Sequence, residues 1–138
     1  MILISACLCG VNCKYNGKNN LNEECLELLK KGEAILVCPE QMGGLETPRN
    51  PSEIKIVNGE VKVFMNDGTD VTENYKRGAE EVLKLAKELN VKKAIFRKKS
   101  PSCGCGEIYD GTFTNTLTKG NGITTSLLLE NSIEVEVR

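Results

Sequence analysis

The sequence predicts a Rossmann-like α/β fold with a mainly parallel sheet, helices on both faces and an accessory β-hairpin. Short apolar runs alternate with segments of helical periodicity, which is the pattern of parallel strands joined by right-handed crossovers. Residues 54–57 and 61–64 alternate around Asn58-Gly59, as in a hairpin with a two-residue turn. A length of 138 residues with 40% apolar and 27% charged content fits one globular domain over residues 1–138.

The first half of the chain contains two expected strands with a helix between them. Residues 2–4 are a short apolar strand, and residues 34–37 are a second one. Between them, apolar residues at helical spacing predict a helix that stops at Gly32. Its apolar stripe consists of Leu21, Cys25, Leu28 and Leu29. A loop rich in Gly and Pro follows from 43 to 51, and its length predicts that it covers a site.

The second half continues the alternation of helices and strands. A long amphipathic helix is expected to have Thr72 as its N-cap and to end near Asn90. Residues 94–96 then form a buried strand. Residues 120–128 contain a Gly-Asn-Gly opening followed by a last helical segment, and residues 133–137 alternate as a final, half-buried strand.

The charge balance gives no global field that would recruit nucleic acid or an anionic membrane, because the net charge is −1. Positive charge is nevertheless concentrated before residue 100, at Lys92, Lys93, Arg97, Lys98 and Lys99. Any contact with a polyanion is therefore expected to be local. Neither a signal sequence nor a long apolar span is evident, so a cytoplasmic protein is expected.

Seven cysteines and no histidine restrict the chemistry. An odd number of cysteines without an export signal favours metal binding or thiol chemistry over a disulfide scaffold. The absence of histidine removes the commonest general base and the commonest nitrogen ligand of zinc, copper and non-haem iron. Carboxylate, hydroxyl, lysine and thiolate groups remain for any mechanism.

Three of these cysteines, Cys7, Cys38 and Cys103, come shortly after predicted strands. Because the carboxyl ends of parallel strands lie at one edge of a sheet, we expect the three to be neighbours at the edge where such sheets bind ligands. The loop at 100–106 adds a proline and two glycines, which let the backbone approach a ligand closely. The sequence therefore predicts a site at this edge.

Eight short motifs resemble those of the thiouracil desulfurase family and follow the family's order over nearly the whole chain. They are Ser5-Ala6-Cys7-Leu8, Lys14-Tyr15-Asn16-Gly17, Cys38-Pro39-Glu40, Gly43-Gly44-Leu45, Pro48-Arg49, Asp70-Val71-Thr72, Ser100-Pro101-Ser102-Cys103-Gly104 and Ile108-Tyr109-Asp110-Gly111-Thr112-Phe113. The resemblance implies a small α/β protein that carries a [4Fe-4S] cluster on three cysteines. One iron is then free for the sulfur of a thiolated nucleobase.

The resemblance also implies roles for particular residues. By position in the motifs, the cluster ligands would be Cys7, Cys38 and Cys103, and Glu40 and Ser100 would assist attack on the substrate. Glu40 would take a proton from the attacking water.

Two departures and two extra thiols accompany the resemblance. Lys14 stands where the family often has Arg, and Asn16 where it often has Asp, so substrate contacts at this turn are expected to differ. Cys9 and Cys105 leave open a fourth ligand, which would close the free iron.

Plainer roles compete for the same residues. Unpaired cysteines are often simply buried, and helical spacing makes Cys25 a core residue. The remaining thiols, Cys9, Cys13 and Cys105, are expected not to be ligands. Glu40 could instead cap a helix or pair with Arg49, and Ser100 could be a turn hydroxyl.

The substrate side has its own candidates. Tyr15, Tyr109 and Phe113 can stack on a pyrimidine, since aromatic faces accept any base, although two of the three are expected in the core. Lys98 and Lys99 would contact phosphate if the substrate is a thiolated nucleotide or tRNA. Otherwise the two lysines form a solvated face.

Three functions remain open from the sequence. The first is an enzyme that converts a thiolated pyrimidine, as free base, nucleotide or tRNA, to its oxo form and releases sulfide. The second is a module in which four cysteines hold zinc and the basic run binds RNA. The third is a cluster with cysteine at every iron that delivers electrons or sulfur.

Overall fold

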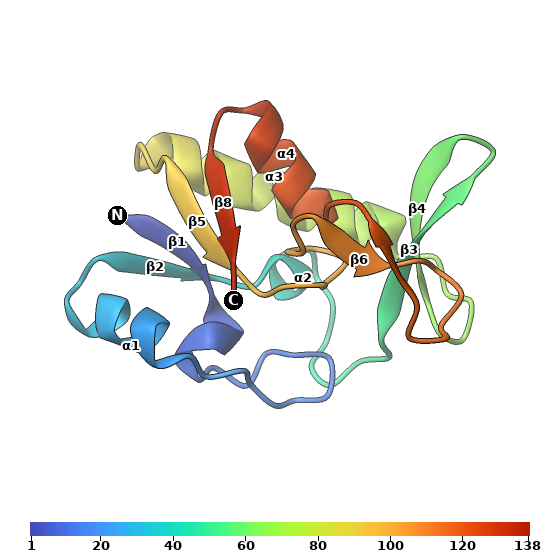
Figure 1. Ribbon diagram of the computed structural model, residues 1–138, viewed down its shortest axis with the longest axis horizontal. Helices are drawn as coiled ribbons and strands as arrows, with labels where there is room; N and C mark the ends of the chain where they lie inside the picture. Colours follow the sequence, from blue (N-terminus) through green and yellow to red (C-terminus); the bar gives the residue numbers. More distant parts are fainter.

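A four-stranded parallel sheet forms the centre of the molecule (Figure 1). In the computed structural model, which describes residues 1–138, the strands are β1 (Ile2–Ser5), β2 (Ala34–Val37), β5 (Lys93–Phe96) and β8 (Glu134–Val137). Their order across the sheet is β2-β1-β5-β8, and every neighbouring pair is parallel. The predicted strands are therefore confirmed, and their carboxyl ends share one edge.

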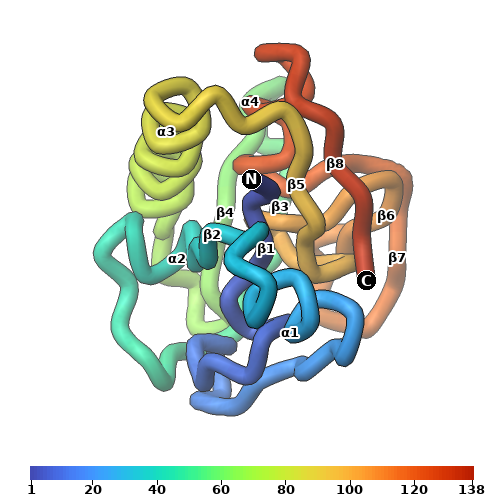
Figure 2. The backbone as a smooth tube through the Cα atoms, turned by 90° about the vertical axis from the view of Figure 1, so that its left-hand side faces the viewer, coloured from blue at the N-terminus to red at the C-terminus, as the bar shows by residue number.

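Helices cover both faces of this sheet, as predicted (Figure 1; Figure 2). On one face, Cys25 of α1 (Glu23–Lys30) packs with Ile4 and Ile95. On the other, residues of α3 (Thr72–Glu88) and α4 (Ile123–Glu130) pack with Leu3 and Phe96. Successive strand residues point to opposite faces of a sheet, so β1 and β5 divide their apolar side chains between two cores. None of the helices is long and apolar enough to span a membrane.

The predicted N-cap of α3 is wrong by one residue. The helix begins at Thr72, and the residue before it, Val71, makes no side-chain capping bond. The Thr72 hydroxyl is buried, donates to Asp70 Oδ1 at 2.6 Å and accepts from the Val63 amide at 2.9 Å. Thr72 thus fastens the start of α3 to the neighbouring hairpin, which is a tertiary contact that capping statistics do not contain.

The predicted hairpin is present as a separate two-stranded sheet that projects from the body of the molecule (Figure 1). Its strands are β3 (Ser52–Val57) and β4 (Glu60–Met65). Asn58 and Gly59 both have positive φ, at 51° and 79°, as the tight turn requires. The base of this hairpin packs against Tyr75 of α3, so the hairpin is anchored beside the sheet rather than added to it.

A second hairpin, of β6 (Glu107–Tyr109) and β7 (Leu117–Lys119), was not predicted. Its strands are three residues each, and Ile108 is their single buried side chain, so they carry little periodic signal. Two short helices, η1 (Ala6–Cys9) and α2 (Pro39–Met42), follow β1 and β2 directly. They turn the chain at the carboxyl edge of the sheet.

Two glycines bring α2 against α3. A Cβ on Gly78 would lie 2.9 Å from the carbonyl carbon of Pro39 and still closer to its oxygen. A Cβ on Gly43 would meet the Asn74 carbonyl in the same way. Only glycine at both positions allows this approach, which fixes the place of α2 and of Glu40 on it.

Gly78→Ala is therefore expected to destabilise the protein, by about 1–3 kcal/mol as an overpacking substitution. A glycine in an unconstrained helix would give the opposite sign, since alanine is favoured there by about 1 kcal/mol. Urea unfolding of Gly78→Ala and of Glu80→Ala, an exposed position in the same helix, measures the difference. Unchanged or increased stability of Gly78→Ala would contradict the close approach.

Candidate functional site

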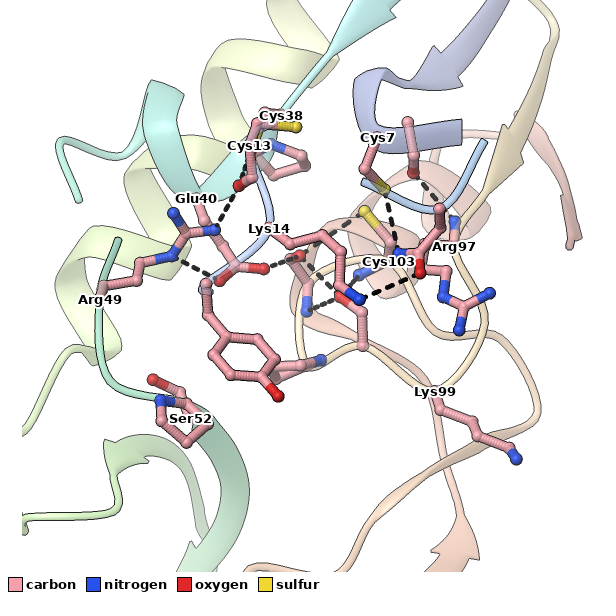
Figure 3. A pocket seen from close by; sticks show the side chains of 18 of the residues that line it. Cys7, Cys13, Lys14, Cys38, Glu40, Arg49, Ser52, Arg97, Lys99 and Cys103 are labelled. Carbon is pink, nitrogen blue, oxygen red and sulfur yellow. Dashed lines mark hydrogen bonds and ion pairs between the residues drawn. The ribbon is translucent and has the colours of Figure 1, made fainter. Parts of the chain in front are cut away.

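The three cysteines predicted to meet do line one cavity, of about 510 Å³, at the carboxyl edge of the sheet (Figure 3). Cys7 lies on η1 just after β1, Cys38 lies between β2 and α2, and Cys103 ends the loop after β5. Positions far apart in the sequence are thus brought together by the parallel topology. Figure 3 shows their side chains around one space, with Glu40 and Arg49 beside them.

Local sequence explains how each cysteine is held. Gly10, at φ 88°, ends η1 and lets its amide bond to the Cys7 carbonyl. Pro39 at the first position of α2 stops β2 and starts the helix. In the third loop, Ser100 Oγ accepts from the Ser102 and Cys103 amides at 3.1 and 3.0 Å, which bends the chain so that Cys103 faces the cavity.

Cys13 is a fourth thiol of the same cavity. A hydrogen bond with the Cys13 side chain lowers the pKa of Cys7 to about 7, although burial alone would raise it. A second hydrogen bond with Cys13 lowers the pKa of Cys38 to about 7 in the same way. The pKa of Cys13 itself is raised, because ionisation would remove the proton that Cys38 and Cys7 share. Asn20 Nδ2, 3.7 Å from the Cys7 sulfur, also favours its thiolate. Thiolates available near neutral pH suit a metal-binding role.

Cys103 has a different environment. Burial raises the pKa of its thiol to about 12, and hydrogen bonds with Ser5 and Ser102 oppose that rise. The Ser102 hydroxyl lies 3.5 Å from the Cys103 sulfur. In turn the Ser5 hydroxyl accepts from the Arg97 amide at 2.9 Å. A metal that binds Cys103 would replace the thiol proton, and the two hydroxyls would remain to hydrogen-bond the thiolate.

The donor set fits an iron–sulfur cluster better than a single metal ion. No group of three or more Cys, Asp or Glu side chains converges closely enough to hold one ion, whereas zinc requires sulfur donors about 2.3 Å from one point. A cluster takes thiolates that are spread over a wider space and held by loops.

The other cysteines do not reach the cavity. Cys25 lies on α1 and is fully buried against the sheet, so its predicted core role is confirmed. Cys9 is buried in the same core, and Cys105 is half-buried; neither lines the cavity. A fourth ligand, left open at Cys9 or Cys105, is therefore not available from either residue as placed here.

Glu40 lies at the centre of a hydrogen-bond network. Its Oε1 accepts from Arg49 Nε at 3.1 Å and from the Tyr75 hydroxyl at 2.9 Å. Its Oε2 accepts from the Ser102 hydroxyl at 2.9 Å. The Arg49 side chain is only 4% exposed and that of Glu40 16%, so this ion pair is largely removed from solvent. Pairing with Arg49, the plainer role considered for Glu40, is present together with a place on the cavity wall.

Ser102, like Tyr75, belongs to this network but was not predicted to be a site residue. Its hydroxyl is buried and lies 2.9 Å from Ser100 Oγ as well as 2.9 Å from Glu40 Oε2. Ser100 therefore shapes the turn by accepting from two amides, as the plainer prediction expected. It is also connected with Glu40 through the Ser102 hydroxyl. The available signal was the position of Ser102, directly before a cysteine within the Ser-Pro-Ser-Cys motif.

The mouth of the cavity carries the predicted aromatic and basic residues. Tyr15, Tyr109 and Phe113 all line it, and Tyr15 and Phe113 are 44% and 37% exposed. The expectation that two of the three lie in the core is therefore wrong. These side chains come from irregular turns or a short hairpin, where periodicity does not distinguish a site from a core.

The cavity has an excess of positive charge. Its lining contains five cations and two carboxylates, namely Lys14, Arg49, Arg97, Lys98, Lys99, Glu40 and Glu53. Lys14 Nζ donates to Asn20 Oδ1 at 3.1 Å, while Asn16 accepts from the Lys18 amide and does not line the cavity. The loop at 43–51 reaches the cavity through Arg49 and Pro51, in keeping with its predicted position over the site.

Comparisons with known proteins show the family to which this chain is related. The family model described as 2-thiouracil desulfurase matches residues 2–138. An uncharacterised protein of Bacillus subtilis (strain 168), YbbK, is 42% identical over 141 residues, which cover 98% of this chain and 93% of that protein. A solved structure of TudS, a [4Fe-4S]-dependent thiouracil desulfidase, superposes with a TM-score of 0.91 at 39% identity and covers 99% of this chain and 89% of its own.

The family resemblance seen in eight motifs is therefore confirmed along the chain by sequence and by structure. With a match over residues 2–138 and a four-stranded parallel sheet that brings the motif cysteines to one cavity, the protein belongs to the 2-thiouracil desulfurase family.

Proposed function

We propose that this protein replaces the sulfur of a thiolated pyrimidine with oxygen from water. The reaction is hydrolytic and balances without electron transfer, because the C=S group and one water give a C=O group and hydrogen sulfide. The observation that carries the proposal is the meeting of three motif cysteines and Glu40 in one cavity of a chain from this family. A volume of about 510 Å³ lies within the ~300–1,000 Å³ usual for small-molecule sites.

Cys7, Cys38 and Cys103 are proposed to hold a [4Fe-4S] cluster. They are the cavity thiols that lie at the ends of β1, β2 and β5, and a rigid sheet therefore fixes their separation. When bound, such a cluster supplies a Lewis-acidic iron for the substrate's sulfur. The likeness to TudS, which is [4Fe-4S]-dependent, supports this assignment.

Glu40 is proposed as the general base that accepts a proton from the attacking water. Arg49 and Tyr75 both donate to Oε1, while Oε2 has only the Ser102 hydroxyl as a partner. Oε2 is therefore the oxygen with capacity for a proton. Arg49 and Tyr75 keep the carboxylate in one orientation, and Ser102 connects it with Ser100 at 2.9 Å.

The pyrimidine ring is proposed to bind among Tyr15, Tyr109 and Phe113. All three line the cavity and come from two separate segments of the chain. Stacking on aromatic faces is sequence-tolerant and contributes about 1–3 kcal/mol per base. It would hold the ring while leaving its edge, and hence the sulfur, free to face the thiols.

The basic residues favour a substrate that carries phosphate. Lys98 is exposed and Lys99 half-buried, and both line the cavity together with Arg97. A free base has no phosphate for these cations, whereas a thiolated nucleotide or tRNA places phosphates beyond the ring. The substrate is thus proposed to be a phosphate-bearing thiolated pyrimidine, with the free base as a poorer substrate.

Lys98→Glu combined with Lys99→Glu is expected to weaken a phosphate-bearing substrate while leaving turnover of thiouracil nearly unchanged. Each phosphate contact with a polymer releases condensed counterions, so the affinity of wild-type protein for a thiolated tRNA should fall steeply with salt. Binding measured at several salt concentrations tests this, with Lys30→Glu plus Lys31→Glu at the C-terminal end of α1, outside the cavity, as a charge-matched control. Equal loss on both substrates would mean that the two lysines shape the cavity instead.

The function itself is tested with anaerobically reconstituted protein and a panel of thiouracils, thiouridine monophosphate and thiolated tRNA. The proposal expects a brown protein that releases one sulfide per pyrimidine converted, and no conversion after a chelator removes the iron. A colourless protein, or a brown one that exchanges electrons but converts none of these substrates, would contradict it.

A further inference from the structure

Cys13 is the one cavity thiol to which the proposed function gives no role. Cys13 is only 2% exposed, yet it lines the cavity together with Cys7 and Cys38, and its carbonyl oxygen lies 3.8 Å from the Cys38 sulfur. Figure 3 shows Cys13 directly beside Cys38. The chain therefore places a spare thiol in the same cavity as the residues assigned to the cluster and beside one of them, Cys38.

The position of Cys13 is fixed by several main-chain bonds. Its carbonyl accepts from Arg49 Nη2 at 2.9 Å and lies 3.8 Å from the Cys38 sulfur. Its amide donates to the Val11 carbonyl at 2.9 Å. Arg49 is itself held by Glu40 at 3.1 Å, so the contact between Cys13 and Cys38 belongs to the rigid part of the site.

No other spare cysteine has such contacts. Cys9 is buried to a similar degree but faces the core under α1, and Cys105 is half-buried outside the cavity. Chemistry that needs a neighbouring thiol is therefore open to Cys13 alone among the spare cysteines.

We propose that Cys13 is a resolving thiol, which forms a disulfide with Cys7 or Cys38 when the cluster-free protein meets a peroxide. Hydrogen peroxide oxidises the sulfur of Cys7 or Cys38 to a sulfenic acid, and one water leaves. The Cys13 sulfur then attacks that sulfur, the S–S bond forms, and a second water leaves. Two thiols and one peroxide give one disulfide and two waters, with both electrons passing to the peroxide.

The disulfide would protect a cluster ligand. A sulfenic acid without a resolving thiol proceeds to sulfinic and sulfonic acids, which ordinary thiol reductants do not reverse. A disulfide is reversed by such reductants, and both sulfurs return for cluster assembly. This protective role rests on the proposed function, through the assignment of Cys7 and Cys38 as ligands; formation of the cross-link does not.

The experiment uses full-length protein freed of iron under anaerobic conditions and treated with hydrogen peroxide. Free thiols are then alkylated, and tryptic peptides are sequenced by tandem mass spectrometry. Cys7 and Cys13 share one tryptic peptide and Cys38 lies in another, so the expected products are an internal bridge or a cross-linked pair, each lighter by two hydrogens. Cys9→Ser, which removes a thiol from the same peptide, should leave the cross-link intact.

A second readout measures recovery of the cluster. Peroxide-treated wild type and Cys9→Ser, after reduction with dithiothreitol and reconstitution, should regain the iron and sulfide content of untreated protein. Cys13→Ser should regain at least about twofold less, with sulfinic acid on Cys7 or Cys38 in its peptides.

Two results would overturn the proposal. One is a wild-type peptide map in which Cys13 stays free, a result that does not depend on any variant folding. The other is full recovery of iron by Cys13→Ser after peroxide. Both are read without substrate, so a protein that forms the cross-link yet converts no thiolated pyrimidine would overturn the proposed function and leave Cys13 as a resolving thiol.

Discussion

Replacing any one of Cys7, Cys38 and Cys103 with alanine is expected to abolish cluster assembly, whereas Cys25→Ala should assemble a cluster normally. The first three line the cavity at the ends of three strands, while Cys25 lies on α1, is fully buried in the core and does not line the cavity. A cluster on three thiolates has no ligand to spare. Iron and sulfide contents of the four anaerobically reconstituted variants measure the effect.

The matched control is Cys25→Ala, because it removes the same group from a site that only packs. Its protein should unfold at a lower urea concentration than wild type and still load iron fully. Full loading of Cys7→Ala, Cys38→Ala or Cys103→Ala would refute the assignment of that residue as a ligand.

Glu40→Gln is expected to keep the cluster and to lose turnover by about 10²- to 10⁴-fold, the usual contribution of a general base. Glutamine has nearly the same shape and can still accept from Arg49 and Tyr75, but its amide cannot take a proton from water. Steady-state kinetics with kcat and KM separated should place the loss in kcat. Ser100→Ala should lose less, because Ser100 reaches Glu40 only through Ser102.

Glu53→Gln gives the comparison within the same cavity. Glu53 Oε1 accepts from the amides of Gly111 and Phe113 at 3.0 and 3.1 Å, and the amide oxygen of glutamine can still accept from both, so Glu53→Gln should change kcat and KM little. If Glu40→Gln turned over at the wild-type rate, a group other than Glu40 would have to accept the proton of the attacking water.

Several features of the fold could be predicted from the periodicity of apolar residues, because the buried positions of each strand and helix have to be apolar. The strands β1, β2 and β5 are apolar runs because both faces of the sheet are covered by helices. Asn58-Gly59 specified the tight turn through its backbone conformation. Once the strands were known to be parallel, the meeting of Cys7, Cys38 and Cys103 at one edge followed from topology.

Other features depend on contacts that periodicity does not report. The β6–β7 hairpin has one buried side chain, Ile108, and is held by the loop around it. Thr72 is not the N-cap of α3, and its hydroxyl instead accepts from the Val63 amide in β4. Cys13 and Ser102 became visible only when residues 25 and 62 positions away, Cys38 and Glu40, were brought beside them.

The hydrolytic reaction is tested most directly by the origin of the oxygen in the product. Reconstituted protein would be incubated anaerobically with a thiolated pyrimidine in water enriched in heavy oxygen, without any reductant or oxidant. The account predicts an oxo-pyrimidine that carries one heavy oxygen atom, with one sulfide released from the substrate for each molecule of product formed. A product formed only when an electron donor or acceptor is added, or one without the heavy oxygen, would contradict it.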